Sequence, residues 1–66
     1  MNLRVNGRPV ELDGPTPLND YLRSLDIDPR AVAVEVNEQI LERAEFAGTT
    51  LVDGDVVEIV RMVGGG

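Results

Sequence analysis

The stretch LVDGDVVEIVRMV at residues 51–63 decides the fold, because it contains a turn signal followed by a pattern typical of a strand. The sequence Asp53-Gly54-Asp55 is typical of a turn, since aspartate and glycine favour the backbone conformations that turns require. The segment 56–63 is rich in valine and isoleucine, whose branched side chains suit a pleated sheet. We therefore expect a turn followed by the last strand of a sheet.

The two faces of this last strand follow from its charged residue. Glu58 is expected to face solvent, and side chains two residues apart in a strand share a face. Val60 and Met62 then lie on the outer face with Glu58, while Val57 and Ile59 point into the core. Exposed apolar side chains often mark an interface, so Glu58, Val60 and Met62 are predicted to bind a partner protein. The alternative is that a neighbouring loop covers the two apolar side chains.

The chain opens with a pattern typical of a β-hairpin. Leu3 and Val5 alternate with polar residues, which predicts a strand with one buried face. Asn6-Gly7 is a tight-turn signal, because both residues tolerate positive φ. The alternation resumes over residues 8–12, and Pro9 favours a position at the sheet edge for this second strand.

A short helix is expected after the hairpin. Thr16 followed by Pro17 is typical of a helix N-cap and first helical position, and the helix is predicted over roughly residues 17–25. The segment 26–29 ends it, since proline disfavours helical geometry in the residue before it. One apolar stripe of this helix is predicted to face the core, formed by Leu18, Leu22 and Leu25.

The middle of the chain predicts two further strands. Residues 32–36 alternate valine with alanine and glutamate, residues 37–38 suit a turn, and residues 39–41 suit a short return strand. Phe46 and Leu51 are expected to lie under the sheet. The resulting fold class is α+β: a small mixed sheet packed on one main helix, which also supplies the crossover that a parallel strand pair needs.

Composition excludes several classes of function. Cysteine and histidine are absent, which rules out disulfides, cysteine-ligated zinc and nucleophiles activated by histidine. Twelve acidic residues stand against six scattered arginines, giving a net charge of −6 that argues against nucleic-acid binding. The acidic balance indicates either a basic protein partner or simply a well-solvated acidic surface. The aspartates at 26 and 28 and at 53 and 55 lack the other ligands of a calcium loop, so no metal site is expected.

No segment suggests a membrane or a secretion signal. No apolar run approaches the roughly 20 residues needed to span a bilayer, and the N-terminus has no signal-peptide pattern. We expect a cytoplasmic protein of one domain, residues 1–63, followed by a flexible glycine tail, residues 64–66.

The terminal Val63-Gly64-Gly65-Gly66 is the most informative motif. Three residues extend at most about 10 Å, and glycines form a thread thin enough to enter a narrow channel of a partner enzyme. Glycine also reaches backbone conformations forbidden to other residues, so the thread can follow a curved channel. Gly64 and Gly65 are therefore predicted to enter partners, with the carboxylate of Gly66 at the reacting end.

The chain resembles the ubiquitin-like β-grasp sulfur carriers, and among them the sulfur carriers of thiamine biosynthesis. The resemblance covers nearly all 66 residues. It rests on residues 34–41, on Arg43, on residues 51–60 and on the terminal glycines. The turn Asp-Gly-Asp before an apolar strand and Gly-Gly is specific to these carriers as a group and less specific among them.

The resemblance implies a carrier that is not itself an enzyme. An adenylyltransferase related to the ubiquitin-activating enzymes would adenylate the carboxylate of Gly66, so ATP is consumed by this partner and no cofactor is bound by the carrier. A sulfur donor enzyme would then supply the sulfur of a C-terminal thiocarboxylate, and thiazole synthase would take it up. Two alternatives remain open: a carrier for molybdopterin or cysteine synthesis, and a β-grasp interaction module with an incidental glycine end.

Overall fold

The computed structural model describes residues 1–63, and the predicted tail Gly64–Gly66 lies outside the described residues. Within residues 1–63 the chain forms a five-stranded mixed sheet with the strand order β2-β1-β7-β4-β5, and a separate two-stranded sheet of β3 and β6. The elements in chain order are β1 (Asn2–Val5), β2 (Arg8–Glu11), β3 (Thr16–Pro17), α1 (Leu18–Ser24), the 3₁₀ helix η1 (Pro29–Ala31), β4 (Val32–Val36), β5 (Gln39–Ile40), the 3₁₀ helix η2 (Arg43–Gly48), β6 (Thr50–Leu51) and β7 (Val56–Arg61).

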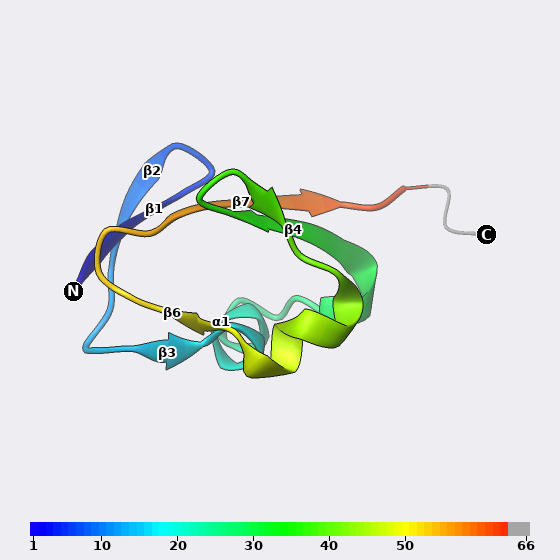
Figure 1. Cartoon of the computed structure of the whole chain (residues 1–66), viewed down its shortest axis with the longest axis horizontal. Coiled ribbons are helices and arrows are strands. Elements are labelled where there is room, and N and C mark those ends of the chain that lie inside the picture. The colour runs from blue at the N-terminus through cyan, green and yellow to red at the C-terminus, as the bar shows by residue number, and fades with distance from the viewer. Residues whose placement is uncertain (64–66) are drawn as a thin grey trace.

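The two predicted layers are visible in Figure 1, where the large sheet lies above α1, η2 and the β3–β6 pair. The last strand, β7, occupies the centre of the sheet. It runs parallel to β1, with Val5 opposite Val57, and antiparallel to β4, with Val34 opposite Ile59. The parallel pair confirms the predicted crossover, and the fold class is the predicted α+β arrangement.

The opening hairpin matches its prediction. Asn6 and Gly7 both have positive φ, 52° and 80°, and they connect β1 to β2 as an Asn-Gly turn does. Leu3 and Val5 are buried, and β2, which contains Pro9, is an edge strand. Proline is tolerated there because an edge strand leaves backbone groups unpaired.

The predicted N-cap at Thr16 is wrong, and the helix begins one residue later than predicted. Thr16 and Pro17 form β3, which pairs with β6, and α1 begins at Leu18 without a side-chain cap. The Thr16 hydroxyl instead donates a hydrogen bond to the carbonyl of Gly14 at 2.8 Å. Pairing with Leu51, a residue distant in sequence, therefore overrides the local capping signal.

The predicted core stripe of the helix is correct for two of its three leucines. Leu18 and Leu22 are fully buried, whereas Leu25 is 46% exposed. The helix ends at Ser24, and Asp26 adopts a positive φ of 60°, which turns the chain away. Leu25 therefore lies beyond the last helical turn, where the helical spacing of the stripe no longer applies. Tyr21 is buried instead.

The lower layer covers the core with side chains that the sequence analysis expected under the sheet but did not assign to a helix or strand. Phe46 in η2 and Leu51 in β6 are buried, as predicted, although neither element was expected. η2 begins with a capping box in which Glu42 and Glu45 satisfy each other's backbone N–H groups. The buried cluster joins both layers and consists of Leu3, Val5, Leu18, Tyr21, Leu22, Val32, Val34, Phe46, Leu51 and Val57.

Candidate functional site

The central strand β7 leads directly towards the C-terminus. Its antiparallel pairing with β4 continues one residue beyond Arg61, because the Met62 N–H donates a hydrogen bond to the Ala31 carbonyl at 2.9 Å. Val63 follows and is 89% exposed. The chain thus leaves the folded body at the end of the central strand, which is paired with a strand on each side. The predicted reacting residue Gly66 and the tail residues Gly64 and Gly65 lie outside the described residues.

The two faces of β7 agree with the predicted alternation. Val57 is fully buried and Ile59 is half-buried against the core, whereas Glu58, Val60 and Met62 are exposed. Within residues 1–63 no loop covers Val60 or Met62, so the alternative of a covering loop is wrong for this part of the chain. Their role in binding a partner stays a prediction.

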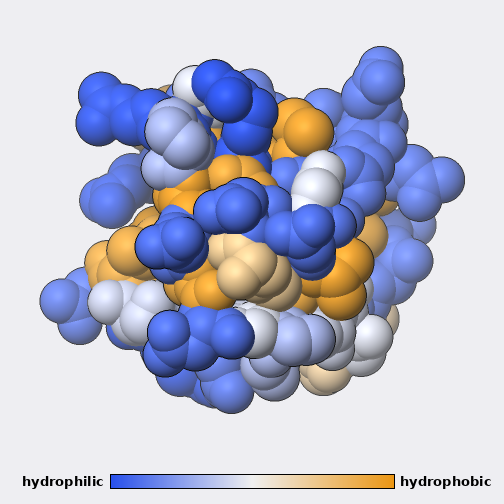
Figure 2. Space-filling view, turned by 90° about the vertical axis from the view of Figure 1, so that its left-hand side faces the viewer, coloured by the Kyte–Doolittle hydropathy of each residue, from blue (hydrophilic) through white to orange (hydrophobic). Residues whose placement is uncertain are grey.

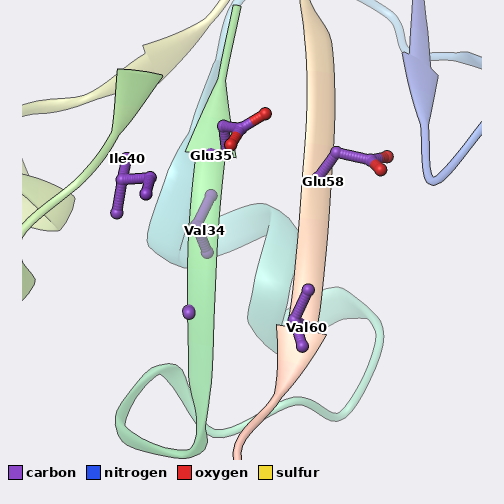
Figure 3. Close-up of a pocket in the computed structure, with 6 residues that line it drawn as sticks. Val34, Glu35, Ile40, Glu58 and Val60 are labelled. Carbon is purple, nitrogen blue, oxygen red and sulfur yellow. The ribbon is translucent and has the colours of Figure 1, made fainter. Parts of the chain in front are cut away.

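A shallow hollow of about 150 Å³ lies on this outer face, between β7, β4 and β5. Figure 3 shows Glu35 and Glu58 on the neighbouring strands β4 and β7, with Ile40 beside β4 and Val60 further along β7. Ala33 completes the outer lining. The sequence pointed to Glu58 and Val60 but missed Glu35 and Ile40. Glu35 could have been placed by the alternation in residues 32–36, whereas the position of Ile40 depends on how β5 pairs.

The surface of this hollow is mostly apolar, and the Glu58 carboxylate points away from β4 in Figure 3. Glu35 and Glu58 are direct partners in the β4–β7 register. Among residues 1–63 neither carboxylate has an ion pair or a side-chain hydrogen bond. The only ion pairs in that part of the chain join Arg23 to Asp20 and Arg30 to Asp28.

The end of the molecule opposite Val63 has a different character. Figure 2 views this end and shows mostly hydrophilic residues with smaller apolar areas between them. A second hollow of about 200 Å³ lies near the start of β7, between Arg4, Pro9 and Val56. The length of β7, roughly 20 Å for six residues, separates it from Arg61 at the other end of the strand. This hollow is therefore badly placed to guide the C-terminus.

The remaining acidic pairs have structural roles. The Asp28 carboxylate accepts hydrogen bonds from the side chain and backbone of Arg30, which lower the pKa of Asp28 and cap η1. Asp55 is buried, and its two oxygens accept hydrogen bonds from the Asn37 side chain at 2.9 Å and the Val52 N–H at 2.8 Å. No group of three or more potential metal-ligating side chains occurs among residues 1–63.

No helix within residues 1–63 combines the length and the apolar character needed to cross a bilayer. The predicted cytoplasmic location stays a prediction.

The comparisons with known proteins agree with this geometry. The model of the ThiS family matches residues 3–66, which includes the three terminal glycines. The crystal structure of the thiamine biosynthesis protein ThiS from Geobacter metallireducens is 42% identical, with a TM-score of 0.84 and full coverage of both chains. The sulfur carrier protein ThiS of Bacillus subtilis is 37% identical over 65 residues, covering 97% of this chain and 98% of that protein.

A third relative is a larger protein. The thiazole synthase of Magnetococcus marinus is 33% identical to all 66 residues of this chain, which match 20% of its length. The family match over residues 3–66, the high structural similarity and the described strand that leads to the glycine end all agree. The chain therefore belongs to the ThiS family.

Proposed function

We propose that this chain is a sulfur carrier of thiamine biosynthesis that carries sulfur as a thiocarboxylate on Gly66. The observation that supports this most directly is the family match, which extends through residue 66 and so includes the glycine end. The carrier is not a catalyst. It serves as a co-substrate of the enzymes that load and unload its C-terminus.

The loading chemistry begins at the terminal carboxylate, whose oxygen is a poor leaving group. A carboxylate oxygen attacks the α-phosphorus of ATP, and pyrophosphate leaves. The acyl-adenylate that results has a good leaving group. Sulfide (HS⁻) supplied by the donor enzyme then attacks the carbonyl carbon, AMP leaves and a proton is released, which gives the thiocarboxylate. ATP is thus consumed by the adenylyltransferase, and the carrier needs no bound cofactor.

The folded body compensates for the entropy lost when the tail is held. Fixing the backbone of each residue costs roughly 1–2 kcal/mol, so ordering Gly64, Gly65 and Gly66 in a channel opposes binding. The exposed outer face of β7, with Glu58, Val60 and Met62, offers contacts that offset this loss. Its position beside the tail lets one partner engage both.

The acceptor of the sulfur is thiazole synthase in this proposal. A thiazole synthase from Magnetococcus marinus contains a stretch similar to the whole of this chain. Joining a carrier to its acceptor raises the effective concentration of one for the other. Such a fusion therefore supports thiazole synthase as the enzyme that unloads Gly66.

The test is conversion of the full-length chain by its adenylyltransferase in the presence of ATP and a sulfur source. Intact-mass spectrometry should show the exchange of one oxygen for sulfur, and the product should support thiazole formation with thiazole synthase. A chain lacking Gly65 and Gly66 should keep its thermal unfolding midpoint but gain no sulfur. Unchanged mass of the full-length chain with a competent adenylyltransferase would refute the proposal.

A further inference from the structure

The turn between β1 and β2 contains a chemically reactive pair, Asn6-Gly7. The backbone nitrogen that follows an asparagine can attack the side-chain carbonyl carbon of that asparagine, Cγ, and close a five-membered ring. Glycine favours this reaction, because it has no Cβ to obstruct the approach and adopts many backbone conformations. Both residues are exposed, and no atom of residues 1–63 beyond its chain neighbours lies within 4 Å of the place that a Cβ of Gly7 would occupy. Solvent therefore reaches the pair.

The side chain of Asn6 is held by the central strand. Its Nδ2 donates a hydrogen bond to the Ile59 carbonyl at 3.2 Å, and its Oδ1 accepts one from the Ile59 N–H at 2.7 Å. The backbone N–H of Asn6 donates to the Val57 carbonyl at 2.8 Å. The turn thus lies beside β7 (Figure 1), and the side-chain amide continues the pairing of β1 with β7.

These hydrogen bonds oppose the ring closure. Attack on Cγ changes the planar amide of Asn6 into a tetrahedral group and then expels Nδ2, so the geometry that pairs with Ile59 is lost along the reaction. The reaction therefore proceeds from the fraction of molecules in which the turn has opened locally.

We propose that Asn6 is a site of spontaneous deamidation, that its hydrogen bonds to Ile59 slow the reaction in the folded chain, and that the product loosens the attachment of β7. The only co-reactant is water. Because β7 is the central strand of the sheet and is followed by Met62 and Val63, the modification acts on the part of the fold that leads towards the C-terminus. Asn6 thereby limits the chemical lifetime of the folded domain.

The reaction balances without an oxidant or a reductant. The nitrogen of Gly7 forms a bond to Cγ of Asn6, the bond from Cγ to Nδ2 breaks, and ammonia leaves with the proton that the Gly7 nitrogen gives up. Water then opens the cyclic imide. Cleavage between the nitrogen and Cγ gives aspartate, whereas cleavage between the nitrogen and the backbone carbonyl carbon gives isoaspartate, whose main chain runs through Cβ and Cγ. Each product has a new carboxylate and releases a proton.

Either product is a poor partner for Ile59. An ionised carboxylate only accepts hydrogen bonds, so it cannot replace the Nδ2 donor, and its second oxygen would face the Ile59 carbonyl. The carbonyl then loses its hydrogen bond, and the two oxygens repel each other. Isoaspartate also adds a methylene group to the main chain of a two-residue turn, whose geometry sets the register of the hairpin.

Asn37 provides a comparison within the same chain. It also has a positive φ, 51°, and its side chain forms hydrogen bonds of 2.9 Å with the Asp55 carboxylate and the Val56 N–H. The residue that follows it is Glu38, whose Cβ obstructs the attack that glycine permits. Deamidation is therefore expected at Asn6 and not at Asn37, although both side chains are held in turns.

The test of the site is incubation of the full-length chain at mildly alkaline pH, which promotes deprotonation of the attacking nitrogen, with and without denaturing guanidinium chloride. Peptide mapping by mass spectrometry measures the conversion of each asparagine. In denaturant Asn6 should convert faster than Asn37, and folding should slow its conversion about tenfold, since two hydrogen bonds must open. Equal rates in the folded and unfolded chain would overturn the protection by Ile59, and no conversion of Asn6 in denaturant would overturn the site.

The effect of the product on β7 is tested with a variant that contains it from the start. Asn6→Asp should lower the thermal unfolding midpoint of the chain, because the donor to the Ile59 carbonyl is lost. The matched control is Gln39→Glu, which makes the same exchange of an amide for a carboxylate at an exposed residue of β5. Equal midpoints for the two variants would show that the product leaves β7 attached and would overturn this part of the inference.

Discussion

The side chain of Asn6 forms a pair of hydrogen bonds with the backbone of Ile59. Its amide nitrogen Nδ2 donates to the Ile59 carbonyl at 3.2 Å, and its oxygen Oδ1 accepts from the Ile59 N–H at 2.7 Å. The amide side chain thereby imitates a further residue of β1 and extends the parallel pairing with β7. Asn6 does this from the hairpin turn, at a positive φ of 52°.

Asn37 plays the corresponding part on the other side of β7. It also has a positive φ, 51°, and its Oδ1 accepts a hydrogen bond from the Val56 N–H at 2.9 Å. Its Nδ2 donates to the buried Asp55. Two turn asparagines, one from each neighbouring hairpin, therefore hold the strand that leads to the tail.

Replacing Asn6 by alanine should destabilise the fold by about 1–2 kcal/mol, because both hydrogen bonds to Ile59 are lost and alanine tolerates positive φ poorly. The measurement is urea unfolding at neutral pH. Asn6→Gly should recover part of the loss, since glycine adopts positive φ freely. If Asn6→Ala unfolds at the same urea concentration as Asn2→Ala, an exposed position without side-chain hydrogen bonds in residues 1–63, the pairing has no energetic weight.

The sequence predicted the elements whose signals are local. The patterns in residues 2–5, 32–36 and 56–61 correctly predicted the three central strands. The Asn-Gly and Asp-Gly-Asp turns also lie where expected. It also assigned the outer face of β7 correctly. These features depend only on neighbours in sequence, so a single chain contains enough information to place them.

Features that depend on distant residues were missed. β3 exists because Thr16 meets Leu51, and no local signal announces a pair separated by this many residues. The same holds for the hollow, in which Glu35, Ile40 and Glu58 come together only once the β5-β4-β7 register is known. The chemistry assigned to Gly66 came from the terminal motif and from the family resemblance, and it stays a prediction.

Asp55 should matter for stability although it lies in a turn. Asp55→Ala leaves the Asn37 amide and the Val52 N–H without their acceptor, which should cost about 1–3 kcal/mol. The control is Asp13→Ala, an exposed aspartate without side-chain hydrogen bonds in the described part of the chain. Thermal unfolding monitored by circular dichroism distinguishes them, and equal midpoints for the two variants would show that Asp55 acts only through turn propensity.

Tyr21 should make the fold sensitive to alkali. Burial raises the pKa of its hydroxyl above the ordinary value of 10.0, so the folded state favours the protonated form. The stabilisation is complete below the pKa of the unfolded chain and is lost as pH rises through the pKa of the folded chain. Tyr21→Phe should therefore lose less stability than the parent between about pH 9 and 12, as measured by urea unfolding across that range. If the free energy of unfolding falls with rising pH equally in the two proteins, Tyr21 is not the cause of the alkali sensitivity.

The helix offers the sharpest contrast between periodicity and structure. Helical spacing groups Leu22 with Leu25, yet Leu22 is fully buried and Leu25 is 46% exposed beyond the last turn. Leu22→Ala should cost about 2–5 kcal/mol, because it leaves a cavity that its neighbours cannot fill. Leu25→Ala should cost less than about 1 kcal/mol, since an exposed position has little burial to lose. A domain of this size has roughly 3–10 kcal/mol of stability, so Leu22→Ala should unfold near ambient temperature while Leu25→Ala melts close to the parent. Similar losses in both variants would mean that the helix continues through Leu25 in solution and that the stripe predicted from sequence is correct.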